Sequence, residues 1–279
     1  MPPHFATSPG RRQAPLLVLV GLVLVLLLAG CVGKDEEEKP EDKPGSSSST
    51  DPGDDEPAPD PGYGAATVGE CHRMTAAQSV ASVDTSRRVS CSSAHTSVVA
   101  HVGYLRAPVT PTTPLAKRRA LGKRVCEPAY QRLAGGTLAD RATSILTWTL
   151  FTPGQDELER GARWVRCDVV ARSGDKLARL PRKTPLLAQG VPDELQICQT
   201  DTGVDVSCAQ TYAFKVEAVY RAVGQAYPSA PAYTAVARTR CQQLLGSFGG
   251  YWQPPSRAGW AAGDRFIRCL RPSADAAGG

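Results

Sequence analysis

The sequence predicts an α+β fold built from two related small modules, each with a short antiparallel sheet, one main helix and disulfide staples. The first observation is a repeat, because Val89-Ser90-Cys91 recurs as Val206-Ser207-Cys208. The second is a Gly-x-Arg-x-x-Arg-Cys pattern at 161–167 that recurs with the same spacing at 263–269. The third is that all but one of the 9 cysteines fall into two sets of four, which indicates a disulfide framework in an oxidising compartment.

Residues 1–31 predict a lipoprotein signal peptide. Arg11 and Arg12 precede a Leu- and Val-rich run at 16–29, which has the length of a signal-peptide core and is short for a membrane span. The run ends at Leu28-Ala29-Gly30-Cys31, which is similar to the lipobox of bacterial lipoproteins. We therefore expect cleavage before Cys31 and lipidation of its thiol by a diacylglyceryl group with acyl chains such as palmitate. The alternative is an uncleaved anchor running to about Gly33, and both alternatives place the rest of the chain outside the cell.

Residues 32–66 predict a disordered acidic tether. The segment is rich in Pro, Ser, Gly and acidic residues and has no periodic apolar positions, so it cannot bury enough surface to order itself. The whole chain carries +5, the tether −8 and the first 31 residues +2, so residues 67–279 carry +11. That excess could face anionic wall polymers or lipid headgroups, or it could be an ordinary arginine-rich surface.

Two modules with one order of elements follow the tether. We expect the first module at 67–172, a linker at 173–191 without a clear period, the second module at 192–272, and a tail at 273–279.

Alternation of apolar and polar residues predicts a strand after each Val-Ser-Cys motif. In the first module, Val98, Ala100, Val102 and Tyr104 should share one face. In the second, the corresponding set is Phe214, Val216, Ala218 and Tyr220. A further strand is expected at 145–151, and a closing strand in each module should point its cysteine inward, with Arg166 and Asp168 outward in the first.

A helix should lie before each closing strand. In the first module we expect Thr113 as N-cap before Pro114, and a kink or break at Pro128. In the second, Ala237, Cys241, Leu244 and Leu245 recur with helical spacing. Each helix places one cysteine on its apolar face.

The cysteine pairing is open from the sequence, since eight cysteines allow 105 pairings and confinement within modules leaves nine. We expect each helix cysteine to meet the closing-strand cysteine, and the two early cysteines to staple the first hairpin. The predicted pairs are Cys71–Cys91, Cys126–Cys167, Cys198–Cys208 and Cys241–Cys269. Zinc is the rival explanation, but no Cys-x-x-Cys occurs, so we expect no metal and no cofactor.

The ordered motifs resemble the septum-formation domain of actinobacterial envelope proteins, present here in tandem. Val68-Gly69-Glu70-Cys71 is similar to the family's Gly-Asp-Cys opening, and the stretch from Cys91 to His95 is similar to its Cys-Ser-x-Pro-His. Cys126 with Tyr130 fits the middle, and 255–269 fits the end. The resemblance implies a role near the division septum and carries no catalytic residues.

Few residues qualify as candidate binding sites. His95 could bind an anion or act as a base, against the simpler expectation that it caps a turn. Arg163 and Arg265, from the repeated Gly-x-Arg, could bind a carboxylate or phosphate, although Asp264 and Arg265 could instead form a local salt bridge. Trp252 and Trp260, like Trp148 and Trp164, could stack on a sugar or pack in the core.

The sequence therefore favours a non-enzymatic lipoprotein that acts as a binding or scaffold module on the outer face of the plasma membrane. No Gly-x-Ser-x-Gly, His-Glu-x-x-His or Walker-type motif occurs. The expected partners are the membrane, through the lipid anchor, and a cell-wall polymer or division protein; nucleic acid is not expected. The alternatives are a ligand-sensing ectodomain with a pocket between the modules, and a wall-processing enzyme that uses His95.

Overall fold

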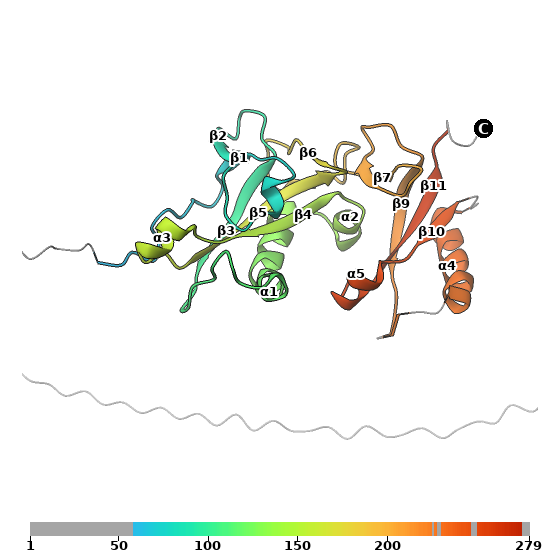
Figure 1. Ribbon diagram of the computed structural model, residues 1–279. Coiled ribbons are helices and arrows are strands. Elements are labelled where there is room, and N and C mark those ends of the chain that lie inside the picture. The colour runs from blue at the N-terminus through green and yellow to red at the C-terminus, as the bar shows by residue number, and fades with distance from the viewer. Residues whose placement is uncertain (1–57, 225, 228–229, 247–249, 275–279) are drawn as a thin grey trace, which may run out of the picture. The chain divides into compact units, whose positions relative to one another are not determined.

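A computed structural model describes residues 58–224, 226–227, 230–246 and 250–274, and within them the chain forms two antiparallel sheets with helices, the predicted α+β class (Figure 1). The expected signal peptide, Cys31 and most of the tether lie outside the described residues. The first sheet has the order β2-β1-β3-β5-β4, with β6 paired to the end of β5. Its strands are β1 (Cys71–Arg73), β2 (Arg87–Val89), β3 (Ser97–Tyr104), β4 (Leu146–Phe151), β5 (Trp164–Ser173) and β6 (Lys176–Ala178).

The second sheet has the order β10-β11-β9-β7-β8. Its strands are β7 (Ile197–Gln199), β8 (Asp205–Ser207), β9 (Phe214–Arg221), β10 (Tyr251–Gln253) and β11 (Phe266–Pro272). One long helix accompanies each sheet, α1 (Leu115–Ala134) with the first and α4 (Ala230–Leu245) with the second. The short helices are η1 (Gln78–Val80), α2 (Leu138–Ala142), α3 (Gln155–Glu159) and α5 (Arg257–Ala261).

Helix α1 buries its apolar face, including Leu121, Cys126 and Ala129, against β4 and β5. Pro114 is the N-cap in place of the expected Thr113, whose hydroxyl accepts a hydrogen bond from the Thr110 backbone N–H at 3.1 Å. Pro128 lies inside the helix and does not split it. Pro128 is exposed, so water can reach the carbonyl one turn earlier that loses its N–H partner. The proline therefore destabilises the helix less here than it would in the core.

The two sheets share one pattern of pairing. Cys71 pairs with Val89 and Val98, and Cys198 pairs with Val206 and Lys215, at identical distances along the chain from the Val-Ser-Cys motif. Each sheet also has a β-bulge in the same place. His101 lies opposite Cys167 with Ala100 unpaired before it, and Ala218 lies opposite Cys269 with Glu217 unpaired.

This bulge corrects the predicted strand faces. An extra residue reverses the alternation beyond it, so Val102 leaves the face of Val98 and packs with Met74, Phe151 and Trp164. Tyr104 is 61% exposed. In the second sheet, Phe214 and Val216 pack in the main core, whereas Tyr220, beyond the bulge, packs with Tyr233 of α4.

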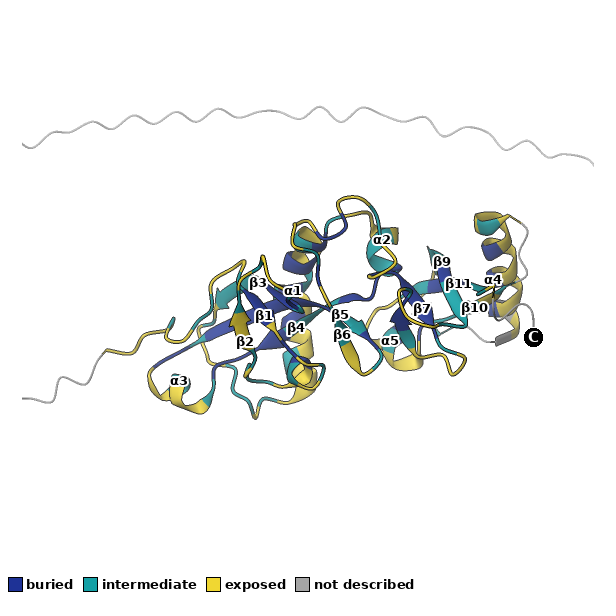
Figure 2. Ribbon diagram, turned by 90° about the horizontal axis from the view of Figure 1, so that it is seen from above, coloured by how far each residue is buried: buried dark blue, intermediate teal, exposed yellow. Residues whose placement is uncertain are grey.

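The main core includes residues of both sheets. Val98, Val169, Val216 and Leu270 belong to one buried cluster, and Figure 2 shows buried residues along β5 and β7. Backbone hydrogen bonds also cross between the halves, as from the Ile145 N–H to the Leu195 carbonyl at 2.8 Å. The two halves therefore pack directly against each other and are not separated by a flexible linker.

The segment expected as a linker takes part in this core. Residues 173–178 complete β5 and form β6, and Leu180, Leu186 and Leu187 are buried. The segment packs in the core and does not act as a linker because burial removes the apolar surface of these leucines from water. Their positions have no regular period in the sequence.

The end of the expected tether is also ordered. The Asp60 N–H donates to the Arg160 carbonyl at 3.1 Å, and the Trp164 indole donates to the Tyr63 carbonyl at 2.9 Å. The guanidinium of Arg160 stacks over the Tyr63 ring at 4.7 Å. The folded part thus includes residues 60–63 of the expected tether, which dock through Asp60 and Tyr63.

Four disulfides join Cys71 to Cys91, Cys126 to Cys167, Cys198 to Cys208, and Cys241 to Cys269. These are the pairs chosen from the sequence. Cys126, Cys167, Cys241 and Cys269 have no exposed surface, so two bridges lock the long helices onto their sheets. No helix in the described part of the chain is both long and apolar enough to span a bilayer.

Candidate functional site

The most polar buried site lies on the face of the first sheet opposite α1, beneath the loop at 74–86. Arg166 is its centre. Its Nε lies 2.7 Å from Asp168 Oδ1, and its terminal nitrogen lies 2.6 Å from Asp84 Oδ2 and 3.0 Å from Asp168 Oδ2. The Ser97 hydroxyl donates to Asp168 Oδ2 at 2.5 Å. The strand pattern predicted that Arg166 and Asp168 face outward, but only 6% and 0% of their side chains are exposed.

His72 extends this ion network toward the surface. Its Nδ1 lies 3.1 Å from the Ser86 hydroxyl and 3.4 Å from Asp84 Oδ2, and its Nε2 lies 3.7 Å from Glu70 Oε2. Nε2 is buried without a hydrogen-bond partner. Burial, and then the charge of Arg166, lower the pKa of His72, so the imidazole is neutral at pH 7.

Asp84 and Arg166 both remain charged in this network. Burial alone would raise the pKa of Asp84, but hydrogen bonds from Ser86 and the charge of Arg166 outweigh it and lower that pKa. Burial likewise opposes the charge of Arg166, and Asp168 with Asp84 more than restores it, raising its pKa. Arg166 thus lies between the carboxylates of Asp84 and Asp168, and these ion pairs fasten the covering loop to the sheet.

The second half has a smaller counterpart. Arg268 lies at the position equivalent to Arg166, and its Nη1 donates to both carboxylate oxygens of Asp205 at 2.8 Å. The signal that could have identified both sites was the repeated Arg-Cys, since an arginine beside an inward cysteine faces the other side of the strand.

His95 lies in neither network. Its side chain is 1% exposed, and its Nδ1 lies 2.9 Å from the Ser93 carbonyl oxygen. His95 therefore caps a turn, which was the simpler of the two expectations for this residue.

Arg163 and Arg265 are not brought together, because each begins the closing strand of its own sheet. Arg163 is half-buried, and its backbone N–H donates to the Pro61 carbonyl at 2.9 Å. Arg265 stacks over the Trp260 ring at 4.0 Å and donates to the Trp260 carbonyl at 2.5 Å. The expected salt bridge with Asp264 is replaced by a hydrogen bond from the Phe266 N–H to the Asp264 carboxylate at 2.9 Å.

The tryptophans serve packing in this structure. Trp260 is 5% exposed, and its ring meets Tyr227 edge-on at 5.6 Å. Trp252 is half-buried, with Arg238 5.7 Å from its ring. Trp148 donates its indole N–H to Glu127 at 2.7 Å. The candidates therefore do not converge on one groove, and within the described residues no group of His, Cys, Asp and Glu could hold a metal ion.

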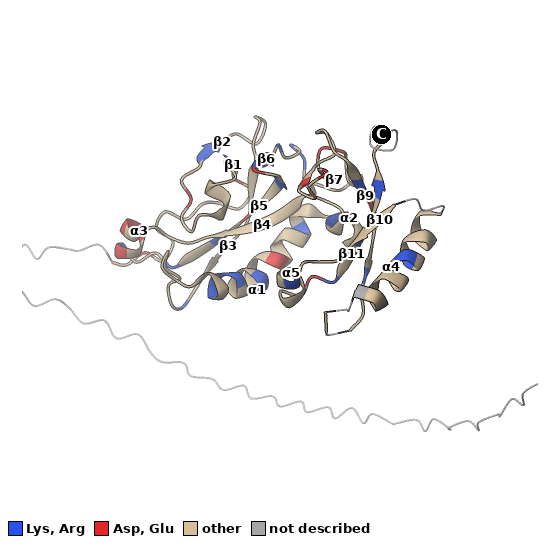
Figure 3. Cartoon of the chain, turned by 45° about the vertical axis from the view of Figure 1, so that its right-hand side comes forward, with Lys and Arg blue, Asp and Glu red and all other residues tan. Residues whose placement is uncertain are grey.

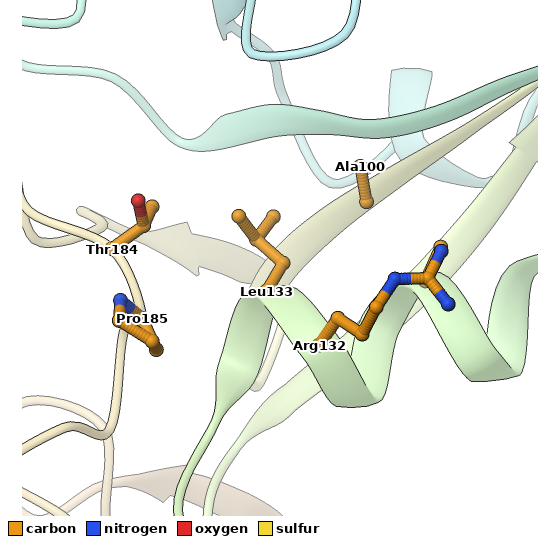
Figure 4. Close-up of a pocket in the computed structure, with 6 residues that line it drawn as sticks. Ala100, Arg132, Leu133, Thr184 and Pro185 are labelled. Atoms are coloured by element: carbon orange, nitrogen blue, oxygen red, sulfur yellow. The ribbon is translucent and has the colours of Figure 1, made fainter.

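A shallow pocket of about 220 Å³ opens where the C-terminal half of α1 meets β3 and the segment at 184–185. Its wall is largely apolar, from Ala100, Ala129, Leu133 and Pro185. Figure 4 shows Arg132 on one side and Thr184 on the other, with Leu133 between them. A second shallow pocket lies around the Cys71–Cys91 bridge.

Helix α1 is rich in lysine and arginine (Figure 3). Helix α1 holds six cationic residues and one acid, Glu127. Five of the six cations are exposed and form what we call the basic face: Lys117, Arg119, Lys123, Arg124 and Arg132. Much of the positive charge expected for residues 67–279 thus lies on this helix, a location that the net charge alone does not predict.

Comparison with known proteins gives one match. The family described as septum formation matches residues 68–254, in a single stretch that covers most of both sheets. No curated protein and no solved structure matches the chain.

Proposed function

Because the chain belongs to the septum-formation family, we propose that it is a membrane-anchored extracytoplasmic lipoprotein that acts as a non-enzymatic binding or scaffold module of the cell envelope during septum formation. The observation that carries the proposal is that every cysteine in the described residues forms a disulfide. Such bridges persist in oxidising compartments and are rare in the cytosol. The bridges thus suggest an extracytoplasmic protein.

The anchor rests on the sequence around Cys31. A diacyl group there supplies two chains, which suffice for stable attachment where a single chain is marginal. The shared register of the two sheets, including the bulges at Ala100 and Glu217, supports the further proposal that the module is a tandem duplication.

The binding role is supported by what the polar groups of the structure do. Arg166 and His72 hold a loop, and His95 caps a turn beneath the surface. The pocket beside α1 contains one arginine and belongs to the first half, so the ligand-sensing alternative gains no observation of its own.

The test is localisation in live cells combined with a pull-down from cross-linked envelopes. We expect Cys31→Ala to release the chain from the membrane fraction and to abolish acyl labelling, whereas the matched tether variant Ser48→Ala stays anchored. A chain with reduced cysteines in the cytosolic fraction would refute the proposal. Uniform envelope staining, with neither a wall polymer nor a division protein captured, would remove the septal role.

A further inference from the structure

We infer that the basic face of α1 binds a linear, phosphate-bearing polyanion of the cell envelope, an inference that rests on the envelope location proposed above. The first support is that its charge is not neutralised. Among the described residues, no salt bridge involves Lys117, Arg119, Arg124 or Arg132. Lys123 donates only to a neutral group, the Ala262 carbonyl, at 2.8 Å.

The one acid of α1 is occupied elsewhere. Glu127 accepts hydrogen bonds from the Trp148 indole at 2.7 Å and from Gln131 at 3.2 Å. Both donors are neutral, so the carboxylate is held to one side and forms no ion pair with the arginines. An anion arriving from solution would therefore find cations that no carboxylate of the described chain has paired.

The spacing of the basic face suits an extended ligand. Along a helix that rises 1.5 Å per residue, Lys117 and Arg124 lie about 10 Å apart, and Arg124 and Arg132 about 12 Å apart. The Cys126–Cys167 bridge fixes the helix to β5, so Lys117, Arg124 and Arg132 form a rigid row, with Arg119 and Lys123 farther around the helix. A rigid row loses less entropy on binding a polymer than a flexible basic tail would.

Phosphate and carboxylate are the anions that suit these side chains. Three members of the face are arginines, whose planar guanidinium groups bind phosphate oxygens through two parallel hydrogen bonds.

A soluble polymer fits better than a bilayer. Helices that lie in a membrane interface insert an apolar face rich in Trp, Phe or Leu. The apolar face of α1 is already buried on the sheet, and Leu115, at its first turn, is the only large apolar residue of the helix that is strongly exposed. The basic face could touch headgroups but would have nothing to insert.

The pocket at the C-terminal end adds a place for a substituent. Arg132 belongs both to the basic face and to the wall of the 220 Å³ pocket, opposite Thr184. Drug-sized sites run from roughly 300 to 1,000 Å³, so this one suits a single small group carried on a polymer backbone.

Helix α4 shows that the basic face is a property of the first half. It occupies the corresponding place on the second sheet but carries only two arginines. Arg238 lies over the Trp252 ring, and Arg240 donates to Gln243 at 3.3 Å. Duplication of the fold therefore does not account for the cations of α1.

The experiment measures binding of the purified full-length chain in neutral detergent to inorganic polyphosphate across a salt series. The test variant is Lys117→Gln/Arg124→Gln/Arg132→Gln. A control of equal charge, Arg87→Gln/Arg221→Gln/Arg240→Gln, removes exposed cations from other surfaces. We expect the test variant to weaken binding about tenfold, with the slope of log affinity against log salt reduced by about one for each cation removed. The control should bind like the unaltered chain.

Three results would overturn the inference. The first is equal weakening by both triple variants, which would reduce the effect to net charge. The second is equal binding to polyglutamate, which would remove the preference for phosphate. The third is binding to vesicles of anionic lipid without binding to polyphosphate, which would assign the face to the membrane. If the inference is right, the triple variant also loses capture of wall polymer in cells while it keeps its envelope localisation. Loss of envelope localisation by the unaltered chain would instead contradict the proposed function, so the two failures are distinguishable.

Discussion

Arg166 and Asp168 lie two residues apart on β5 and form an ion pair with 2.7 Å between Arg166 Nε and Asp168 Oδ1. Both point away from α1 because Cys167 between them points toward it. Asp168 has no exposed surface, and the Arg166 guanidinium also lies over the Phe151 ring at 4.8 Å. The pair is therefore shielded from water and is the part of the covering loop's attachment that should be most sensitive to substitution.

Asp168→Asn should destabilise the fold by about 3 kcal/mol, because removing one partner leaves the other charge buried and incompletely paired. Urea denaturation under non-oxidising, non-reducing conditions measures it. The matched control is Asp193→Asn, which removes a carboxylate that is 69% exposed and paired with Lys215. That change should cost less than about 1 kcal/mol. Equal effects would mean that the buried pair contributes no more than a surface one.

The free energy of unfolding should decrease with falling pH over a range set by the pKa of His72 in the unfolded and folded states. The unfolded chain has the ordinary pKa near 6.5, and the folded pKa is lower because of burial and Arg166. Between these two values the unfolded state binds more protons, so the free energy of unfolding decreases as the pH falls from 6.5 toward the folded value and then levels off. The groups facing His72 are Glu70, Asp84, Ser86 and Arg166.

His72→Gln should remove that decrease, since glutamine does not titrate. Denaturation of both proteins from about pH 7.5 to about pH 5 measures it, and His101→Gln, outside the network, serves as the control. A wild-type profile that matches the His72→Gln profile would contradict the assignment. The lowered pKa of Asp84 acts separately, in a window below its ordinary value of 3.8.

The bridge between α1 and β5 should stabilise more than the hairpin bridge in the second half. The Cys126–Cys167 bridge spans 41 residues and the Cys198–Cys208 bridge spans 10, which correspond to about 4 and about 3 kcal/mol from chain entropy. We expect Cys126→Ala/Cys167→Ala to lower the melting temperature more than Cys198→Ala/Cys208→Ala. The reverse order by calorimetry would show that loop length does not govern these bridges.

Gly122→Ala should destabilise the protein despite alanine's better helix propensity. A Cβ at this position would lie 2.4 Å from the Trp148 ring, so the gain of about 1 kcal/mol in propensity is outweighed by overpacking of about 1–3 kcal/mol. The double variant Gly122→Ala/Trp148→Leu should be more stable than the sum of the two single changes predicts. Additive effects by denaturation would show that the helix can shift to accept the methyl group.

Local patterns in the sequence predicted the longer strands (β3, β4, β5, β9 and β11), the long helices and the α+β class, because burial of one face imposes a period of two or 3.6 residues. The short strands β6 and β10 were not predicted. The cysteine spacing placed one staple between each helix and its closing strand. The bulges at Ala100 and Glu217 were not foreseeable in this way, since the cost of an unpaired residue is decided by the partner strand.

The tertiary structure decides what covers the face of each sheet that lies away from its long helix. Asp168 in the first half corresponds by register to Leu270 in the second, and Ser97 corresponds to Phe214. The polar pair lies beneath the loop at 74–86, while the apolar pair joins the core shared by the two halves. A strand pattern says which residues share a face, but not whether water, a loop or another sheet will cover it.

The sequence by itself determined the division of eight cysteines into two sets of four, the similar order of elements in the two halves and the apolar faces of their helices, because each depends on residues close together in the chain or on a repeated motif. Only the tertiary structure decided that Arg166 and Asp168 are buried, that His95 is covered, and that the basic face of α1 lacks acidic partners. Those properties depend on contacts between segments that are far apart in the chain, and such contacts produce no periodic pattern in the sequence.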